Sequence, residues 1–320
     1  MTRSGPAAAL RLAATALGLA LVSGPALRAQ DLSPRVYVIT PVRSNAVTLG
    51  NIFNDGNLRF EGTVPIEGAT GRLNVPSLTL YRSLSFFGRS ANVAATLPYG
   101  VGHFKGTVQE AEVDAYRSGL LDPIFRFSVN LYGAPAMDLP EIRNWRQKTL
   151  VGASLKIVPP TGQYDPAKLV NLGSNRWSFK PELGLSRRFG SWVLDAYAAV
   201  WLFTKNPEFF SRNQYFPGTR SQTQDPIFAF ETHLSYDVRP RLWVSLDGNF
   251  WYGGRTSLDG VENPSTLQQS SRIGVTASIP LTRRQAIKLG YADGAYVRFG
   301  GDYKIASVAW QYSWVSGAPK

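Results

Sequence analysis

Runs of alternating apolar and polar residues recur along this sequence between residues 46 and 314, and they restrict its fold more than any other feature. In the run at residues 241–254, five apolar side chains fall on one face of a strand: Leu242, Val244, Leu246, Phe250 and Tyr252. The opposite face carries polar or amphipathic side chains: Trp243, Ser245, Asp247, Asn249 and Trp251. Because strand side chains alternate between two faces, each run predicts a strand with one apolar and one polar surface.

The length of these runs and the positions of their aromatic residues favour a membrane barrel. Each run has about 10 to 14 residues, whereas strands in soluble globular proteins usually have about 5 or 6. Aromatic residues gather near run ends, which suits the two girdles of a transmembrane barrel: Phe86, Phe87, Trp201, Phe203, Trp251, Tyr252, Trp310, Tyr312 and Trp314. Strands of a soluble β-sandwich also alternate apolar and polar residues, so a sandwich stays open as an alternative.

The connections between runs differ in length. Tight turns (SRRFGSW at 186–192, YDVRPRL at 236–242) alternate with longer polar loops at Ala134–Lys148, Lys205–Thr223 and Gly253–Gln269. Outer-membrane barrels have short turns on one side and long loops on the other. We therefore predict an all-β fold: residues 30–320 form a single antiparallel transmembrane β-barrel of about 12 strands, within a range of 10 to 14. The barrel must close, because unpaired backbone groups cannot face hydrocarbon.

The first 29 residues have the pattern of a cleaved secretory signal peptide. Arg3 and Arg11 supply the positive section, residues 12–22 the apolar section, and Ala26 or Ala29 the cleavage point. The formal net charge of +12 becomes +9 when the three arginines of residues 1–29 are removed. The basic residues that remain are scattered, and the densest pairs lie beside turns. Solvated loop ends therefore explain them better than nucleic-acid binding.

Few residues in the chain could support catalysis or metal binding. Cysteine is absent and only two histidines occur, so we predict no metal site and no cofactor. His233 shares a strand face with Glu231 and Ser235, but such neighbours lie about 7 Å apart along a strand. No nucleophile-elbow sequence accompanies them. We predict no catalytic residues and no enzymatic activity.

The predicted inner faces collect charges of both signs, together with one histidine: Arg126, Lys156, Lys180, Glu182, Asp195, Glu231, His233, Asp247 and Arg272. A narrow lumen must pair or hydrate such groups, because an isolated charge in low dielectric is costly. These residues could form a structural ladder of ion pairs or line a conduction path that sets solute preference. Four aromatic residues also fall on predicted inner faces: Trp243, Trp251, Tyr197 and Trp201. Their rings could contact apolar or aromatic solutes, or could fill space or belong to a girdle.

The stretch PPTGQYDPAKLVNLGSNRWSFKPELG at 159–184 is the most distinctive in the chain. Its prolines, glycines and asparagines favour turns, so we interpret it chiefly as fixing loop and barrel geometry. With the flanking GASLKIV, and with YVITPVRSNAVTLGNIFNDGNLRFEGTVPI, SFFGRSANVAATLPYG and SGLLDPIFRFSVNLYG, it resembles the family described as "Putative MetA-pathway of phenol degradation". That resemblance implies an exported outer-membrane barrel of transporter type.

Three functional hypotheses follow. The first is a passive outer-membrane channel for small, hydrophobic or aromatic molecules, with membrane lipids, a solute and the barrel-assembly machinery as partners. The second is a barrel that does not transport and serves as a structural or adhesion protein or as an outer-membrane enzyme. The third is a soluble periplasmic β-protein that binds an apolar ligand. The solute, the pore width and the oligomeric state stay open at this level.

Overall fold

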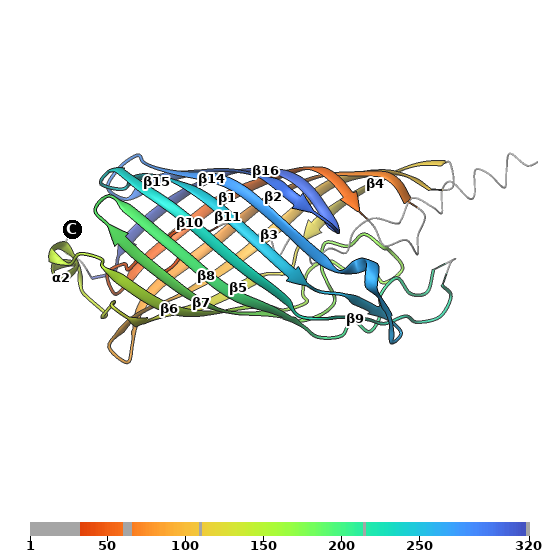
Figure 1. Ribbon diagram of the computed structural model, residues 1–320, viewed down its shortest axis with the longest axis horizontal. Coiled ribbons are helices and arrows are strands. Elements are labelled where there is room, and N and C mark those ends of the chain that lie inside the picture. The colour runs from red at the N-terminus through yellow and green to blue at the C-terminus, as the bar shows by residue number, and fades with distance from the viewer. Residues whose placement is uncertain (1–32, 60–65, 109–110, 214–215, 318–320) are drawn as a thin grey trace, which may run out of the picture.

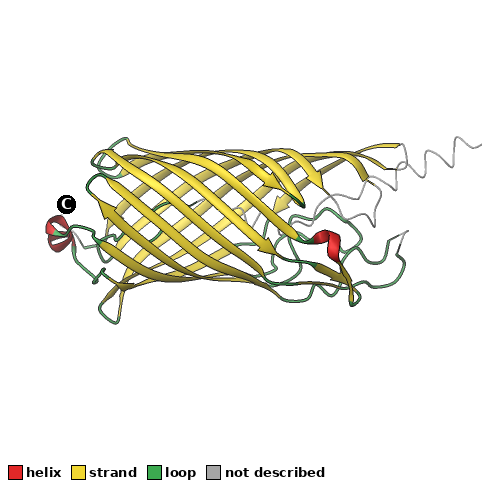
Figure 2. Cartoon of the chain, in the orientation of Figure 1, coloured by secondary structure: helices red, strands yellow, loops and turns green. Residues whose placement is uncertain are grey.

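The computed structural model describes residues 33–59, 66–108, 111–213 and 216–317. Within them a ring of tilted strands surrounds a central lumen (Figures 1 and 2). Among these residues, no helix has the length and apolarity needed to span a membrane. The predicted signal peptide, residues 1–29, lies outside the described part of the chain and stays a prediction.

Twelve antiparallel strands form the ring, in the order β1, β2, β3, β5, β6, β7, β8, β10, β11, β14, β15 and β16. Their bounds are β1 Ser44–Arg59, β2 Ile66–Phe86, β3 Arg89–Val108, β5 Ile124–Tyr132, β6 Thr149–Val158, β7 Ser178–Phe189, β8 Trp192–Phe203, β10 Ile227–Arg239, β11 Leu242–Gly253, β14 Gln268–Pro280, β15 Gln285–Val297 and β16 Gly300–Val315. β1 pairs with β16 from Ser44↔Val315 to Arg59↔Gly300, which closes the ring. The prediction of a closed barrel of 12 strands is confirmed, and the sandwich alternative is wrong.

Several shorter elements lie at the ends of the ring and are not part of it. β4 (Ala111–Leu120) pairs with the second half of β3, from Tyr99 to Val108, and β5 pairs with the first half, so that β4 and β5 lie along β3 one after the other. A three-stranded sheet joins β9 (Gln222–Gln224), β12 (Thr256–Leu258) and β13 (Val261–Asn263), and the 3₁₀ helix η2 (Pro264–Thr266) follows it. The helix α2 (Leu139–Asn144) lies at the opposite end of the barrel (Figure 1).

Apolar side chains cover the outside of the ring. Leu246 on β11 is 57% exposed and its partner Leu234 on β10 is 42% exposed. The residues next to them in sequence, His233 and Asp247, point inward and are at most 1% exposed. This alternation continues around the barrel, as the sequence predicts, and gives the outer surface the apolar character that a membrane requires.

The two ends of the barrel differ in their connections. Tight turns join β2 to β3, β7 to β8, β10 to β11 and β14 to β15 at one end, here called the tight-turn end. Residues 159–177, 204–226 and 254–267 meet at the other, the long-loop end. The prediction that Ala134–Lys148 belongs with the long loops is wrong, because it joins β5 to β6 at the tight-turn end, where α2 lies (Figure 1). Loop length alone does not determine the end on which a loop lies.

Leu246 tests whether this outer surface faces lipid. Leu246 lies in the middle of β11, where the variant Leu246→Arg would place a charge in the hydrocarbon. We expect the free energy of unfolding in vesicles to fall by about 2–4 kcal/mol, measured by urea titration of tryptophan fluorescence.

Val261→Arg is the matched control, because Val261 is 74% exposed in the sheet of the long-loop end. It should change stability by less than about 0.5 kcal/mol. Equal effects of the two variants would contradict the assignment of the outer surface to lipid.

Candidate functional site: the barrel lumen

Residues 33–43 lie inside the barrel and approach β1 from the lumen. Tyr37 is 2% exposed, and its hydroxyl donates to Glu182 Oε1 at 3.0 Å. Its ring occupies the space above Gly152 and Gly184, where an added Cβ would come within 2.2 Å and 2.0 Å of ring carbons. Because these two glycines lack side chains, they leave room for the ring against the barrel wall.

Charged contacts also hold this N-terminal segment. The Arg35 guanidinium pairs with Asp237 at 2.6 Å and stacks over the Trp243 ring at 4.6 Å. The Arg35 backbone N–H donates to Asp195 Oδ2 at 3.2 Å. The predicted inward residues Asp195 and Trp243 therefore both contact the segment, which periodicity did not identify because it contains no strand.

The loop from Ala134 to Lys148 packs beneath the same segment. Ile39, Ala134, Met137 and Leu150 form a buried apolar cluster, and the Val42 N–H donates to the Met137 carbonyl at 2.8 Å. An exposed pair between Arg43 and Asp138 at 3.3 Å adds a further contact. Segment and loop together fill the lumen at the tight-turn end.

A chain of ion pairs crosses the inner wall from β5 to β10. Arg126 Nη2 lies 3.1 Å from Glu182 Oε1, and Lys180 Nζ lies 3.1 Å from Glu182 Oε2. Lys180 also contacts Glu231 Oε1 at 2.7 Å. The Lys180, Glu182 and Glu231 side chains are at most 4% exposed. Each charge therefore has an opposite charge beside it, as burial in low dielectric requires.

His233 extends the chain to β11 and β14. His233 Nε2 lies 3.8 Å from Glu231 Oε2, and Nδ1 lies 2.8 Å from Asp247 Oδ1. Asp247 also accepts hydrogen bonds from Ser245 at 2.8 Å and from Thr276 at 2.6 Å. Both ring nitrogens thus face carboxylates and neither contacts a serine hydroxyl. This arrangement does not form a hydrolytic triad.

Other predicted inward residues lie away from this chain. Trp251 is 1% exposed and packs in a cluster with Val158, Trp201 and Ile227. Trp201 is 3% exposed, so both tryptophans lie on the inner face that strand alternation predicts, and neither belongs to a lipid-facing girdle. An aromatic residue near a strand end can face either surface, and its register determines which.

Arg272 and Lys288 complete the inner charges on this side. Arg272 on β14 is 1% exposed and lies in register with Asn249. Lys288 on β15, which sequence reasoning missed, points over the Trp243 ring at 5.8 Å. Its alternation with Ile287 and Leu289 could have identified it, but the run there is weakly periodic.

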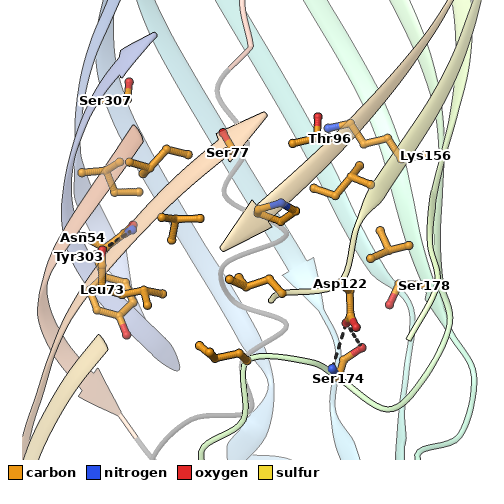
Figure 3. Close-up of a pocket in the computed structure, with 18 of the residues that line it drawn as sticks. Asn54, Leu73, Ser77, Thr96, Asp122, Lys156, Ser174, Ser178, Tyr303 and Ser307 are labelled. Carbon is orange, nitrogen blue, oxygen red and sulfur yellow. Dashed lines mark hydrogen bonds between the residues drawn. The ribbon is translucent and has the colours of Figure 1, made fainter. Parts of the chain in front are cut away.

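An open cavity of about 420 Å³ lies between this charged arc and the long-loop end (Figure 3). Apolar side chains from the arc of β1, β2 and β16 and from one loop line one side: Ile52, Leu73, Val75, Leu172 and Ile305. Polar side chains lie among the apolar ones, two of them on this same arc: Ser77, Thr96, Lys156, Ser178 and Ser307. The expectation that each strand has one polar face does not hold on this arc, because β1, β2 and β16 turn apolar residues toward the lumen.

The distinctive stretch from residue 159 to residue 177 folds back over this cavity. Asp122 accepts hydrogen bonds from the Gly162 N–H at 2.8 Å, the Ser174 N–H at 2.9 Å and the Ser174 hydroxyl at 2.7 Å (Figure 3). Leu172 lines the cavity and packs against the buried cluster around Phe104 and Tyr303. The stretch fixes loop geometry, as the sequence predicts, and it also forms part of the cavity wall.

Hydrogen bonds inside the stretch stabilise this fold. The Asp165 N–H donates to Asn171 Oδ1 at 2.8 Å, and Asn171 Nδ2 donates to the Lys168 carbonyl at 2.7 Å. Lys168 Nζ lies 2.9 Å from Asp165 Oδ2, and this hydrogen bond holds the pKa of Asp165 below its usual value. The loop is thus ordered by its own side chains.

Comparison with known proteins agrees with this architecture. A closed ring of twelve strands with an apolar outer surface and a lined lumen defines an outer-membrane β-barrel protein. The model of the family described as "Putative MetA-pathway of phenol degradation" matches residues 61–303. The chain belongs to this family, which confirms the resemblance seen in the sequence. No curated protein sequence matches it significantly.

Solved structures share the fold at low sequence identity. An outer membrane channel from Pseudomonas putida F1 has a TM-score of 0.74 and 17% identity, over 89% of this chain and 100% of that chain. The β domain of the Bordetella autotransporter BrkA has a TM-score of 0.47 and 10% identity, over 84% and 99%. The TodX deltaS2S3 mutant, a monoaromatic hydrocarbon channel, has a TM-score of 0.48 and 9% identity, over 93% and 96%. At 17% identity, the likeness to the Pseudomonas putida channel establishes a shared fold alone.

Glu231→Gln tests the energetic role of the ion-pair chain. The variant removes one of the two carboxylates around Lys180 and leaves a buried cation with incomplete compensation. We expect the free energy of unfolding to fall by about 3 kcal/mol, measured by urea titration in vesicles. Asp55→Asn, which breaks an exposed pair with Arg72, should cost less than about 1 kcal/mol. Equal losses of unfolding free energy in the two variants would show that the buried ion pairs stabilise the protein no more than an exposed pair does.

Gly184→Ala tests whether the Tyr37 ring needs the space above Gly152 and Gly184. The new methyl group would overlap the Tyr37 ring, so we expect residues 33–43 to leave the wall and become accessible to added protease. Single-channel conductance should rise in the same variant, because the segment fills the lumen. Gly248→Ala is the control, since its Cβ would approach nothing closer than Thr232 Cγ2 at 3.4 Å. An unchanged cleavage rate in Gly184→Ala would contradict the claim that packing of Tyr37 against Gly184 holds residues 33–43 on the wall.

Proposed function

We propose that this protein is an outer-membrane channel through which small molecules of mixed apolar and polar character diffuse down their concentration gradient. The observation that carries the proposal is the open cavity inside a closed barrel, whose lining mixes apolar side chains with hydroxyl groups and Lys156. A ring compound with one polar substituent matches such a lining. The family's description, which names phenol degradation, supports aromatic solutes.

The described structure corresponds to a closed or restricted state at the tight-turn end. Residues 33–43 occupy the lumen there through Arg35 and Tyr37. Solute passage then requires this segment to shift, while the twelve strands stay in place. The proposed transport needs no cofactor and no catalytic residue.

Export and assembly complete the proposal. Residues 1–29 act as a cleaved signal peptide, and the barrel-assembly machinery inserts the mature chain. The last strand, β16, supports this route, because Trp310 and Trp314 face outward near its end and follow the pattern of an aromatic terminal strand. The tight-turn end faces the periplasm, as in other outer-membrane barrels.

Ile52→Trp tests whether solutes use the cavity. Ile52 lines the cavity and is 39% exposed, so a larger ring projects into open space without displacing the wall. We expect flux of phenol-sized solutes into liposomes to fall about tenfold or more, because the remaining passage narrows.

Leu49→Trp on the outer face of the same strand, 53% exposed, should leave flux unchanged. Wild-type liposomes that admit no tested solute, including small ions, would support the alternative of a barrel that does not transport. Equal flux through wild type and Ile52→Trp would place the route elsewhere in the barrel.

A further inference from the structure

Basic residues gather at the tight-turn end of the barrel. Every connection there contains at least one arginine, in five segments: 82–89, 133–148, 187–191, 237–241 and 281–285. With Arg43, these segments hold twelve lysines and arginines against three acidic residues. The surplus is as large as the charge expected for the whole mature chain, so the excess positive charge of this protein is concentrated on one rim. We call these residues the basic rim.

The acidic residues of this end are already engaged. Asp138 pairs with Arg43 at 3.3 Å, and Asp237 pairs with both Arg35 and Arg188 at 2.6 Å. Glu141 accepts the Asp138 N–H at 2.8 Å as part of the cap of α2. Within the described ranges, no ion pair with a carboxylate is found for the other basic residues of the rim.

The long-loop end is built differently. Its charges form local pairs, such as Arg72 with Asp55, Lys105 with Asp114, Arg212 with Glu208 and Arg255 with Glu262. Because the two ends of one barrel differ in this way, general solubility does not explain the surplus at the tight-turn end. The basic rim needs an anionic counterpart from outside the described chain.

The orientation of two arginines identifies that counterpart. Ser83 and Ser186 are buried toward the lumen, so Arg82 and Arg187, one residue away on their strands, point outward toward the membrane. The Arg187 guanidinium lies 5.0 Å from the centre of the Phe189 ring, and Phe189 is 49% exposed. Exposed aromatic rings mark the headgroup level of a bilayer, which places these guanidinium groups among lipid phosphates.

We propose that the basic rim binds anionic phospholipid headgroups in the leaflet at the tight-turn end. A guanidinium group matches a phosphate through paired hydrogen bonds, and basic clusters beside a membrane attract anionic lipids. A dissolved anion on its way through the channel would pass along the lumen, whereas Arg82 and Arg187 lie on the outer wall. The lipid therefore explains these two residues and a solute does not. The inference does not depend on transport through the lumen.

The experiment measures lipid preference directly. The full mature protein is placed in vesicles that mix phosphatidylglycerol with phosphatidylcholine, with bromine on the chains of one lipid or the other. Quenching of tryptophan fluorescence gives the relative association constant of the two lipids. We expect wild type to prefer phosphatidylglycerol, and the double variant Arg82→Gln/Arg187→Gln to lose about twofold or more of that preference.

The matched control removes the same charge from the other end. Lys105→Gln/Lys304→Gln changes two outward residues of β3 and β16 near the long-loop end, and it should keep the wild-type preference. Heat-modifiable gel migration checks folding in both variants. Equal association constants for the two lipids in wild type, or equal losses in the two double variants, would overturn the proposal.

Salt dependence keeps the proposal testable if the rim variant does not fold. Sodium chloride at high concentration should abolish the wild-type preference, since exposed charges are screened, and a preference that survives would contradict the proposal. Inorganic phosphate at equal ionic strength should act no more strongly than chloride. A stronger effect of phosphate would assign the rim to a free anion and overturn the lipid assignment.

Discussion

The need to satisfy every backbone hydrogen bond of a chain that lies in hydrocarbon underlies this whole structure. An open edge would expose unpaired N–H and C=O groups to lipid, at a cost of several kcal/mol for each group. The pairing of β1 with β16 removes that edge over the full length of both strands. Once the ring is closed, strand alternation sends one set of side chains to lipid and the other to an enclosed lumen. The site, its charges and its cavity all follow from that division.

The side chains that face the lumen form two separate groups, one charged and one apolar, for a physical reason. Charged groups withdrawn from bulk water need opposite charges close by, and the strands from β5 to β11 supply them in an unbroken series from Arg126 to Asp247. The arc formed by β1, β2 and β16 instead presents Leu73, Val75 and Ile305, and the stretch from residue 159 to residue 177 covers them. A cavity with a mixed apolar and polar lining lies between the two parts, and this mixed lining is what supports the proposal of an amphipathic solute.

Much of this arrangement could be predicted from the sequence, because strand periodicity is a local property. The alternation of side chains along each strand was enough to place five residues on the inner face, and in the structure all five are buried there: Lys180, Glu182, Glu231, His233 and Asp247. The partners within that set could not be predicted, since they belong to different strands and their contacts depend on register. Arg35 and Tyr37 were missed for a related reason: a segment that packs inside a barrel has no periodic pattern to reveal it. Lys288 was missed because its run alternates only weakly.

The sequence by itself determined a membrane barrel of about twelve strands and which face of most long strands is apolar, because these depend on spacing along one chain, and its motifs indicated the family. Only the tertiary structure decided that Ala134–Lys148 closes the tight-turn end, that Arg35 and Tyr37 enter the lumen, and that the basic turns share one rim. Those features depend on which strands run up and which run down, and on how far each is shifted against its neighbour. Such information appears only when all twelve strands are joined into one ring.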